Sequence, residues 1–216
     1  GLVYAYGENY CYMPAPYAMK TLYEKGEIGE FEYGEGEYIH NCMPSWHGLT
    51  YGEENHWRNT MYATYYCTHS LGPILDIIDD RCVSVSCMMP DVEYNPENSK
   101  QKNGIALFKT EKGAVIRILI CFNAYAGYGH RYMIIGTAGC VENDPTKPLE
   151  EALSYASMRE VDGSIYRKLE IPVPLMAEGE EETRGRGEIK MLRDFISCIQ
   201  NDTDSPIDVD KAINMS

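Results

Sequence analysis

Residues 105–122 read IALFKTEKGAVIRILICF. Two apolar runs, Ile105–Lys109 and Ala114–Phe122, flank the polar, glycine-ended segment Thr110-Glu111-Lys112-Gly113. Strand-like runs joined by a short turn that contains glycine are typical of a β-hairpin. Because hairpin partners run in opposite directions, this stretch predicts antiparallel pairing.

A second hairpin is predicted farther along the chain. Arg131–Ile135 and Cys140–Glu142 flank Gly136-Thr137-Ala138-Gly139, again two runs around a glycine-rich turn. Three other segments have the composition or the two-residue alternation of strands. They are Leu2–Tyr6, Glu30–Ile39 and Cys82–Met88.

Helices are predicted early and late in the chain. They cover Met13–Lys25, Ser70–Asp79 and Glu188–Gln200, and Asp208–Ser216 reads as the first turns of another. Residues 41–59 read as a long loop, and residues 143–175 show weaker order. This arrangement indicates an α+β fold, an open, mostly antiparallel sheet with helices on one face. The other face is then free for a partner.

The composition excludes some kinds of partner. Lys and Arg number 19 against 33 Asp and Glu, which gives a net charge of -14. Binding to phosphate backbones needs clustered basic residues, so no nucleic-acid partner is expected. Tyrosine is abundant, with 18 residues against 4 phenylalanines. Its apolar ring and polar hydroxyl suit half-wet clefts and interfaces.

The 8 cysteines favour a reducing compartment. None belongs to a Cys-x-x-Cys pair, and several fall inside apolar runs, so free buried thiols are the simplest interpretation. The even count also permits a secreted disulfide framework. The apolar stretch 114–126 is broken by Arg117 and Asn123, so neither a bilayer-spanning segment nor a membrane partner is expected. No signal peptide is visible, and the expected location is cytoplasmic.

The stretch Tyr65-Tyr66-Cys67-Thr68-His69-Ser70-Leu71-Gly72-Pro73 concentrates polar chemistry at a predicted helix start. Tyr66 and His69 are three residues apart, so one helical turn points both side chains the same way. Imidazole and phenol can donate, accept and relay protons, which indicates the wall of a small-molecule site. His56-Trp57-Arg58 adds a cation and an aromatic ring. The alternative is a capped helix whose histidine hydrogen-bonds a buried carbonyl.

Several short motifs occur in a particular order. They are Glu8-Asn9-Tyr10, Gly26-Glu27-Ile28-Gly29-Glu30, Glu35-Gly36-Glu37-Tyr38-Ile39-His40, His56-Trp57-Arg58, Thr68-His69 before Leu71-Gly72-Pro73, and Gly136-Thr137-Ala138-Gly139. This order resembles the C-terminal domain of the Gfo/Idh/MocA oxidoreductases. Within them it is most similar to the NAD-dependent glycoside hydrolases that resemble α-N-acetylgalactosaminidase. The resemblance covers residues 3–142 and, more loosely, residues 188–216.

The resemblance implies a two-domain parent, in which an N-terminal Rossmann domain binds NAD or NADP. Residues 1–216 are then the C-terminal domain alone, which serves substrate binding and oligomerisation. No Gly-x-Gly-x-x-Gly motif follows a predicted strand, since Gly34-Glu35-Gly36 and Gly127-Tyr128-Gly129 do not continue the pattern. The chain by itself is therefore expected to be inactive.

The resemblance also implies roles for individual residues. His69 is the catalytic acid/base and Tyr66 is catalytic beside it, as a proton relay. The residues that bind the sugar are Tyr38, Arg58, Thr68 and Tyr128, and Asn9 touches the nicotinamide end of the cofactor. Structural alternatives stay open: Tyr38 as core filler, Arg58 as a partner of Glu53 or Glu54, Tyr128 as a turn residue, and Asn9 as a helix cap.

Two enzyme activities fit the resemblance. A sugar or inositol dehydrogenase transfers hydride to the cofactor while a base removes the hydroxyl proton. A redox-assisted glycosidase then eliminates the leaving group beside the new carbonyl, adds water and returns the hydride. Relatives often carry Gly-His-Gly-Gly where this chain has Arg184-Gly185-Arg186-Gly187, so the sugar or glycoside substrate and the choice of reaction stay open.

A third alternative belongs to a different class, a non-catalytic module that forms a homo-oligomer through the open sheet face. A metal site is not expected, because His40, His47 and His56 are irregularly spaced in the predicted loop.

Overall fold

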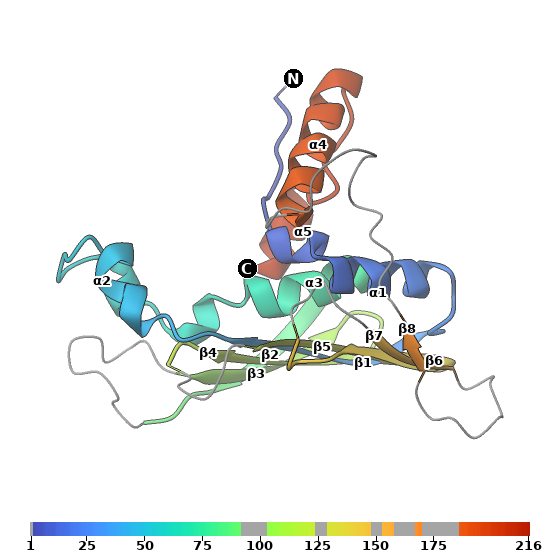
Figure 1. Cartoon of the computed structure of the whole chain (residues 1–216), viewed down its shortest axis with the longest axis horizontal. Coiled ribbons are helices and arrows are strands. Elements are labelled where there is room, and N and C mark those ends of the chain that lie inside the picture. The colour runs from blue at the N-terminus through green and yellow to red at the C-terminus, as the bar shows by residue number, and fades with distance from the viewer. Residues whose placement is uncertain (1, 92–102, 124–128, 148–152, 158–166, 170–185) are drawn as a thin grey trace.

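A layer of helices covers one face of an open eight-stranded sheet (Figure 1). The computed structural model describes residues 2–91, 103–123, 129–147, 153–157, 167–169 and 186–216. This architecture confirms the predicted α+β fold with its open, mostly antiparallel sheet.

The strand order in the sheet is β2-β3-β4-β1-β5-β6-β7-β8. The strands are β1 (Phe31–Ile39), β2 (Cys82–Met88), β3 (Gly104–Thr110), β4 (Val115–Cys121), β5 (Gly129–Gly136), β6 (Gly139–Asn143), β7 (Leu153–Ser157) and β8 (Arg167–Leu169). Both predicted hairpins are present, as β3–β4 and β5–β6. The strand β1 joins them, parallel to β4 and antiparallel to β5.

The helices match the predictions closely. They are α1 (Pro14–Glu24), α2 (Trp46–Leu49), α3 (Thr68–Ile78), α4 (Arg186–Asn201) and α5 (Val209–Met215). Four short 3₁₀ helices lie among them: η1 (Asn9–Tyr12), η2 (Met43–Ser45), η3 (Trp57–Thr60) and η4 (Ala63–Tyr65). The predicted loop 41–59 therefore contains short helical turns.

Two glycines of β1 allow α3 to pack closely on the sheet. A Cβ atom on Gly36 would overlap the carbonyl oxygen of Ser70, and one on Gly34 would lie 3.3 Å from Cγ2 of Ile74. The alternation predicted for this strand is present, with Gly34, Gly36 and Tyr38 buried on the helix side. The packing of α3 on β1 therefore depends on the missing side chains.

The core lies between the sheet and the helix layer. It includes, on the sheet side, Ile116, Ile118, Ile120, Tyr132 and Ile134, and on the helix side Met19, Leu71, Ile74 and Leu75, all fully or almost fully buried. Burying each aliphatic side chain of this size contributes roughly 1.5–3 kcal/mol. This core fixes α3 on β1, β4 and β5.

A proline inside α3 changes its hydrogen bonding. Pro73 has no N–H, so the carbonyl of His69, four residues earlier, has no helical donor. The hydroxyl of Tyr132 in β5 donates to that carbonyl instead. The site-bearing end of α3 is thereby tied to the centre of the sheet.

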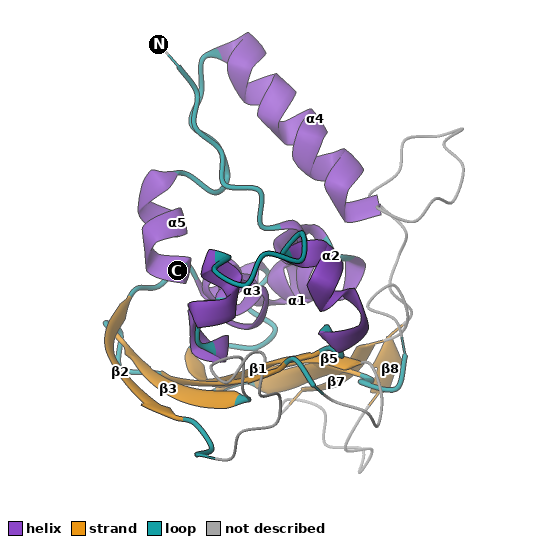
Figure 2. Ribbon diagram, turned by 90° about the vertical axis from the view of Figure 1, so that its left-hand side faces the viewer, coloured by secondary structure: helices purple, strands orange, loops and turns teal. Residues whose placement is uncertain are grey.

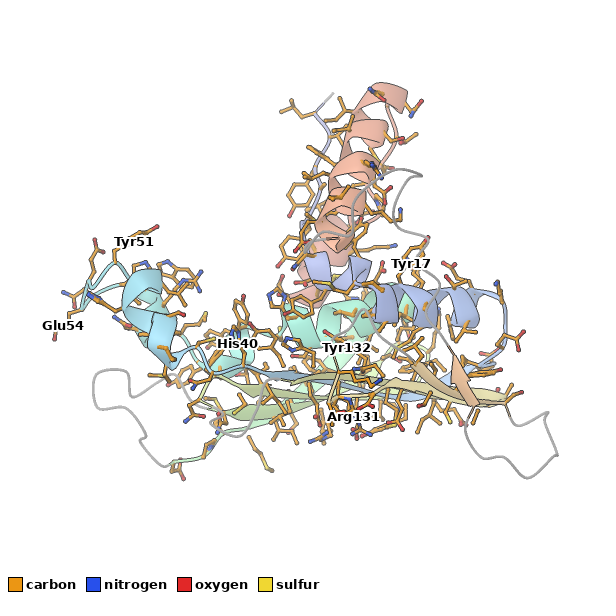
Figure 3. All side chains as sticks on the ribbon, in the orientation of Figure 1. Tyr17, His40, Tyr51, Glu54, Arg131 and Tyr132 are labelled. Carbon is orange, nitrogen blue, oxygen red and sulfur yellow. The ribbon has the colours of Figure 1, made fainter. Side chains whose placement is uncertain are left out.

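The opposite face of the sheet carries a row of ion pairs. Arg117 contacts Glu37 at 2.9 Å and Glu35 at 3.3 Å, and Arg131 contacts Glu35 at 2.8 Å and Glu142 at 3.1 Å. Figure 3 shows Arg131 on this side and its neighbour Tyr132 on the helix side. No described helix covers these charges (Figure 1).

Helix α4 stands away from the sheet and is accompanied by the N-terminal segment (Figures 1 and 2). Leu192, Ile196 and Ile199 recur along α4 at helical spacing, and each is more than half exposed. Leu2 and Tyr4 of the N-terminal segment are exposed as well. Among the described helices none is long and apolar enough to cross a bilayer.

Two predictions of secondary structure were wrong or incomplete. Residues 2–6 are not a strand, because they lie outside the sheet and Tyr6 donates its N–H to the carbonyl of Ile207 instead of a strand neighbour. The segment predicted to show weaker order contains the strands β7 and β8. The sequence of β7 has no pronounced alternation of apolar and polar residues. It forms a strand because it pairs antiparallel with β6.

Candidate functional site

Three tyrosine–histidine pairs meet on the helix side of the sheet. We call them the Tyr–His cluster, which consists of Tyr10, Tyr38, Tyr66, His40, His69 and His130. The cluster gathers η1, the C-terminal end of β1, the start of α3 and the start of β5. Figure 3 shows His40 on the helix side of the sheet.

The first pair is extended by a carboxylate. Nδ1 of His69 lies 2.7 Å from Oε1 of Glu8, and Nε2 of His69 lies 3.1 Å from the hydroxyl of Tyr66. An ionised carboxylate only accepts hydrogen bonds, so Nδ1 carries the proton. In the neutral ring Nε2 then accepts from Tyr66. The arrangement is a histidine whose tautomer is set by a carboxylate, as in acid/base catalysts.

Local structure explains how these groups come together. Glu8 is the N-cap of η1, where its carboxylate also accepts from the backbone N–H of Tyr10 at 3.1 Å. His69 is the second residue of α3, and Tyr66 ends η4 just before that helix. Glu8 is 2% exposed and the side chain of His69 is 17% exposed, so the imidazole keeps access to solvent while the carboxylate does not.

The other two pairs surround the first. The Tyr10 hydroxyl lies 3.0 Å from Nε2 of His130, and the Tyr38 hydroxyl lies 2.8 Å from Nδ1 of His40. The Tyr10 ring stacks on His69 with centroids 4.2 Å apart, and Tyr38 stacks on His130 at 5.0 Å. Tyr38 is thus the central ring of the cluster, in contact with all three histidines.

Burial shifts the protonation of the cluster. Desolvation, reinforced by His40 and His69, lowers the pKa of His130 to about 4. Desolvation and His69 also lower the pKa of His40. Burial, followed by the charge of Glu8, raises the pKa of Tyr66. Near neutral pH the cluster therefore holds neutral His40 and His130 and a protonated Tyr66, which can donate a hydrogen bond.

Arg58 lies close enough to influence this cluster. Burial raises the pKa of the Cys42 thiol to about 11, and the positive charge of Arg58 opposes that rise. The same charge opposes the raised pKa of Tyr66. The guanidinium also lies over the ring of Trp57, with its carbon 4.7 Å from the ring centroid. A positive charge that acts on Tyr66 suits the binding of an oxygen-rich or anionic ligand group.

The remaining predicted site residues have different surroundings. Thr68 acts on Tyr6 of the N-terminal segment, where it opposes the rise that burial gives the pKa of that phenol. Asn9 donates its amide to Oε1 of Glu188 at 3.2 Å, which ties η1 to α4. Asn9 does not cap α1, whose N-cap is Met13. Tyr128 lies outside the described residues.

The structure thus brings together three of the predicted residues, His69, Tyr66 and Tyr38, with Arg58 nearby. Tyr38 is 5% exposed, so it belongs to the core, as the structural alternative predicted. Its hydroxyl also hydrogen-bonds His40, so it is part of the Tyr–His cluster as well. The alternative for His69, a bond from its ring to a buried carbonyl, is not what is seen. Its ring contacts a carboxylate and a phenol.

Sequence reasoning did not assign roles to Glu8, Tyr10, His40 and His130. Glu8 and Tyr10 flank the predicted Asn9, and His40 is two residues from Tyr38. Their closeness in sequence to predicted site residues could have pointed to Glu8, Tyr10 and His40, but not to His130. That residue enters the cluster because β5 pairs with β1 in the register that sets it opposite Tyr38.

Other parts of the described chain are poorer candidates. No three His, Cys, Asp or Glu side chains among the described residues are grouped so that they could hold a metal ion. Two hollows, of about 500 and 210 Å³, share Lys20, Glu24 and Asp76. There Lys20 already pairs with both oxygens of Asp76 at 3.0 Å, so these charges satisfy each other.

The described residues do not provide a complete site for a dinucleotide. Pyrophosphate binds at a glycine-rich turn between a strand and a helix, and no such turn occurs among the described elements. The predicted contact of Asn9 with the nicotinamide is not supported by its surroundings, since its amide is bound to Glu188.

Comparisons with known proteins agree with this geometry. The profile of the GFO/IDH/MocA C-terminal domain matches residues 17–142. Glycosyl hydrolase family 109 protein 2 of Akkermansia muciniphila is 26% identical over 215 residues, covering 84% of this chain and 45% of the relative. A glycosyl hydrolase family 109 protein of Saccharopolyspora erythraea is 23% identical and covers 75% of this chain and 42% of its own length.

Solved structures share the fold. A levoglucosan dehydrogenase in complex with NADH and levoglucosan superposes with a TM-score of 0.77 at 18% identity, over 99% of this chain and 61% of that one. An inositol dehydrogenase homologue from Azotobacter vinelandii has a TM-score of 0.70 at 15% identity, over 96% and 58%. The chain spans less than half the length of the two curated relatives described above. It belongs to the Gfo/Idh/MocA C-terminal domain family.

Proposed function

We propose that this chain is the substrate-binding domain of an NAD(P)-dependent oxidoreductase that acts on a sugar or a glycoside. The observation that carries the proposal is the chain of contacts from Glu8 through His69 to Tyr66. The names of the relatives and of the structural neighbours, which include glycosyl hydrolases and sugar dehydrogenases, support a carbohydrate substrate.

In this proposal His69 moves the proton of a substrate hydroxyl. Glu8 keeps the proton on Nδ1, so the free Nε2 can accept a proton directly or through the Tyr66 hydroxyl. The carboxylate then stabilises the imidazolium that forms. Arg58 orients the sugar oxygens beside Tyr66. A bound nicotinamide would supply the hydride acceptor for the carbon that is oxidised.

The second Tyr–His pair favours the glycosidase version over a plain dehydrogenase. Elimination needs one group to take the C–H proton beside the new carbonyl and another to protonate the leaving oxygen as the glycosidic bond breaks. Tyr38 with His40 supplies a second proton-transfer group. The ring centroids of Tyr38 and His69 are 5.2 Å apart, so this group lies close to the first. The sugar or inositol dehydrogenase is the alternative, and it needs the first pair alone.

The cofactor domain is part of the proposal. An N-terminal Rossmann domain outside these 216 residues would hold NAD or NADP and cover the apolar row Leu192, Ile196 and Ile199 of α4. Such a row, with the exposed Leu2 and Tyr4 nearby, marks an interaction surface more often than a free one. The length of the relatives not covered by this chain suffices for such a domain.

The test uses the chain joined to its cofactor domain. The protein is mixed with NAD or NADP and a panel of nitrophenyl glycosides and free sugars, while nicotinamide absorbance and phenol release are recorded together. Phenol release without net NADH selects the glycosidase, and net NADH selects the dehydrogenase. Neither signal, in a protein shown to bind the dinucleotide, would contradict both activities.

A second function, homo-oligomerisation through the open sheet face, is favoured by the ion-pair row. Arg117, Arg131 and their carboxylate partners present both charge signs, so two copies related by a twofold axis can pair them. Leu107, 48% exposed, adds apolar area to that face, opposite Arg117 in the ladder. This role does not exclude the enzymatic one.

We also propose a reducing, cytoplasmic location. All 8 cysteines are free thiols in the structure, and half of them are buried. Thiols of this kind persist in reducing compartments.

A further inference from the structure

Tyr10 contacts both members of the Glu8–His69 pair. Its backbone N–H donates to Oε1 of Glu8 at 3.1 Å, the same oxygen that lies 2.7 Å from His69. Its ring lies nearly parallel to the imidazole, at 28° with centroids 4.2 Å apart. Tyr10 therefore restrains the carboxylate through the backbone and the imidazole through the side chain.

The far end of Tyr10 is held by His130. The hydroxyl lies 3.0 Å from Nε2 of that residue, which is 8% exposed in β5. The Asn143 side chain accepts from the N–H of Tyr132 at 2.6 Å and donates to the carbonyl of His130 at 2.8 Å, so it fixes the strand on which His130 stands. Tyr38 stacks on the face of the His130 ring, with 5.0 Å between the ring centroids.

We propose that Tyr10 and His130 act together as positioning residues that hold the His69 imidazole in its Nδ1–H tautomer and in contact with Tyr66. The inference rests on the proposed acid/base role of His69 but assigns no substrate. Neither residue touches the reacting atoms in this scheme. The bond to His130 sets the angle of the Tyr10 ring. The stacked ring in turn hinders the rotation of His69 about its Cβ–Cγ bond, which would put ring carbons where Nδ1 and Nε2 now meet Glu8 and Tyr66.

The electrostatics of the cluster agree with this role. The groups that face His130 are Tyr10 from η1, Tyr38 from β1, His40 directly after β1, and His69 from α3. Burial keeps His130 neutral near pH 7, so it adds no positive charge beside His69 when that imidazole takes up a proton. A neutral hydrogen-bonding residue is therefore better suited here than a cation.

The test is ¹⁵N NMR of histidine side chains in the chain itself, with no cofactor or sugar. Measured at about pH 8, above the usual titration range of imidazole, the parent should show His69 as a single Nδ1–H tautomer. With 5 histidines in the sequence, His69→Gln assigns the signal. Tyr10→Phe and His130→Phe should each give a mixture of tautomers, and the double variant should change it no further. His130→Gln, which can still hydrogen-bond Tyr10, should restore the parent spectrum.

Matched controls are Tyr65→Phe and His47→Phe, because both parent residues are exposed and absent from the cluster. They should leave the His69 signals unchanged. A pure Nδ1–H form in folded Tyr10→Phe and His130→Phe would overturn the proposal, even if both variants melt at a lower temperature. Since the readout needs no turnover, an inactive two-domain enzyme would count against the proposed function and not against this inference.

Discussion

Glu8 and His69, separated by 61 positions in the chain, meet with 2.7 Å between Oε1 and Nδ1. The contact joins an N-cap carboxylate of one short helix to the first turn of another. It converts a surface histidine into one with a defined tautomer and a defined direction for its second nitrogen.

Replacing His69 by alanine should remove the proton-transfer group. In the enzyme with its cofactor domain we expect kcat to fall by roughly 10²–10⁴-fold, the usual contribution of general acid/base catalysis. Glu8→Gln, which keeps the shape of the side chain and removes its charge, should also lower kcat. Its effect on KM should be smaller than its effect on kcat. Steady-state kinetics measure both, and Tyr65→Phe is the control. Full activity of His69→Ala would refute the catalytic assignment.

Acid should destabilise the fold through His130. Its pKa is about 4 in the folded chain, against about 6.5 in the unfolded one. Between these values the unfolded state binds more protons, so the free energy of unfolding falls as pH drops from 6.5 to 4. The share of this residue is roughly 3 kcal/mol. Denaturation at a series of pH values should show a shallower acid decline for His130→Gln than for the parent, and His47→Gln should keep the parent slope.

Adding one methyl group to β1 should displace α3. The Cβ of Gly36→Ala would overlap the backbone carbonyl of Ser70, which cannot rotate away as a side chain could. We expect a loss of about 1–3 kcal/mol in the free energy of unfolding, as for other overpacked cores. Gly48→Ala is the matched control, since nothing lies within 4 Å of its added Cβ. Equal urea midpoints for the two variants would contradict the packing argument.

The hydroxyl of Tyr132 should matter only because residue 73 is proline. Tyr132→Phe leaves the buried His69 carbonyl without a donor and should cost about 1–3 kcal/mol of unfolding free energy. In a Pro73→Ala background the helix supplies its own N–H, so the same Tyr132→Phe change should cost clearly less. A double-mutant cycle by chemical denaturation measures the difference. Additive effects would show that the proline and the hydroxyl are independent.

Self-association, if it uses the open sheet face, should be sensitive to Leu107. Leu107→Asp places a charge on that face next to Arg117 and should shift the sedimentation profile towards monomer. Ile196→Asp removes an equally exposed apolar residue from α4 and should leave the profile unchanged. An identical shift for the two variants would indicate non-specific association.

Much of the fold could be predicted because its signals are local. The glycine-rich turns at 110–113 and 136–139 define the two hairpins without any knowledge of the rest. The place of β1 could not be predicted in this way, since its parallel neighbour β4 is far away in sequence. The strand prediction for residues 2–6 was wrong for the complementary reason. These residues have the composition of a strand, but none of the described strands pairs with them.

The site could be predicted only as far as local spacing reaches. Tyr66 and His69 share one helical turn, so their contact follows from sequence separation. Glu8 and His130 reach His69 through tertiary packing and sheet register, which no local pattern encodes. The family resemblance supplied Tyr38 and Arg58, and it passed over Tyr10, whose role depends on a partner in β5.

The position of β1 also has a consequence for how the chain is made. Each hairpin can close as soon as its own residues have been synthesised, but β1 is translated first and its two neighbours, β4 and β5, emerge much later. During that interval its backbone has neither of its two strand neighbours, so its N–H and C=O groups stay open to competing strands. The strand that joins the two hairpins in the finished sheet is thus the one whose strand neighbours are synthesised last relative to itself.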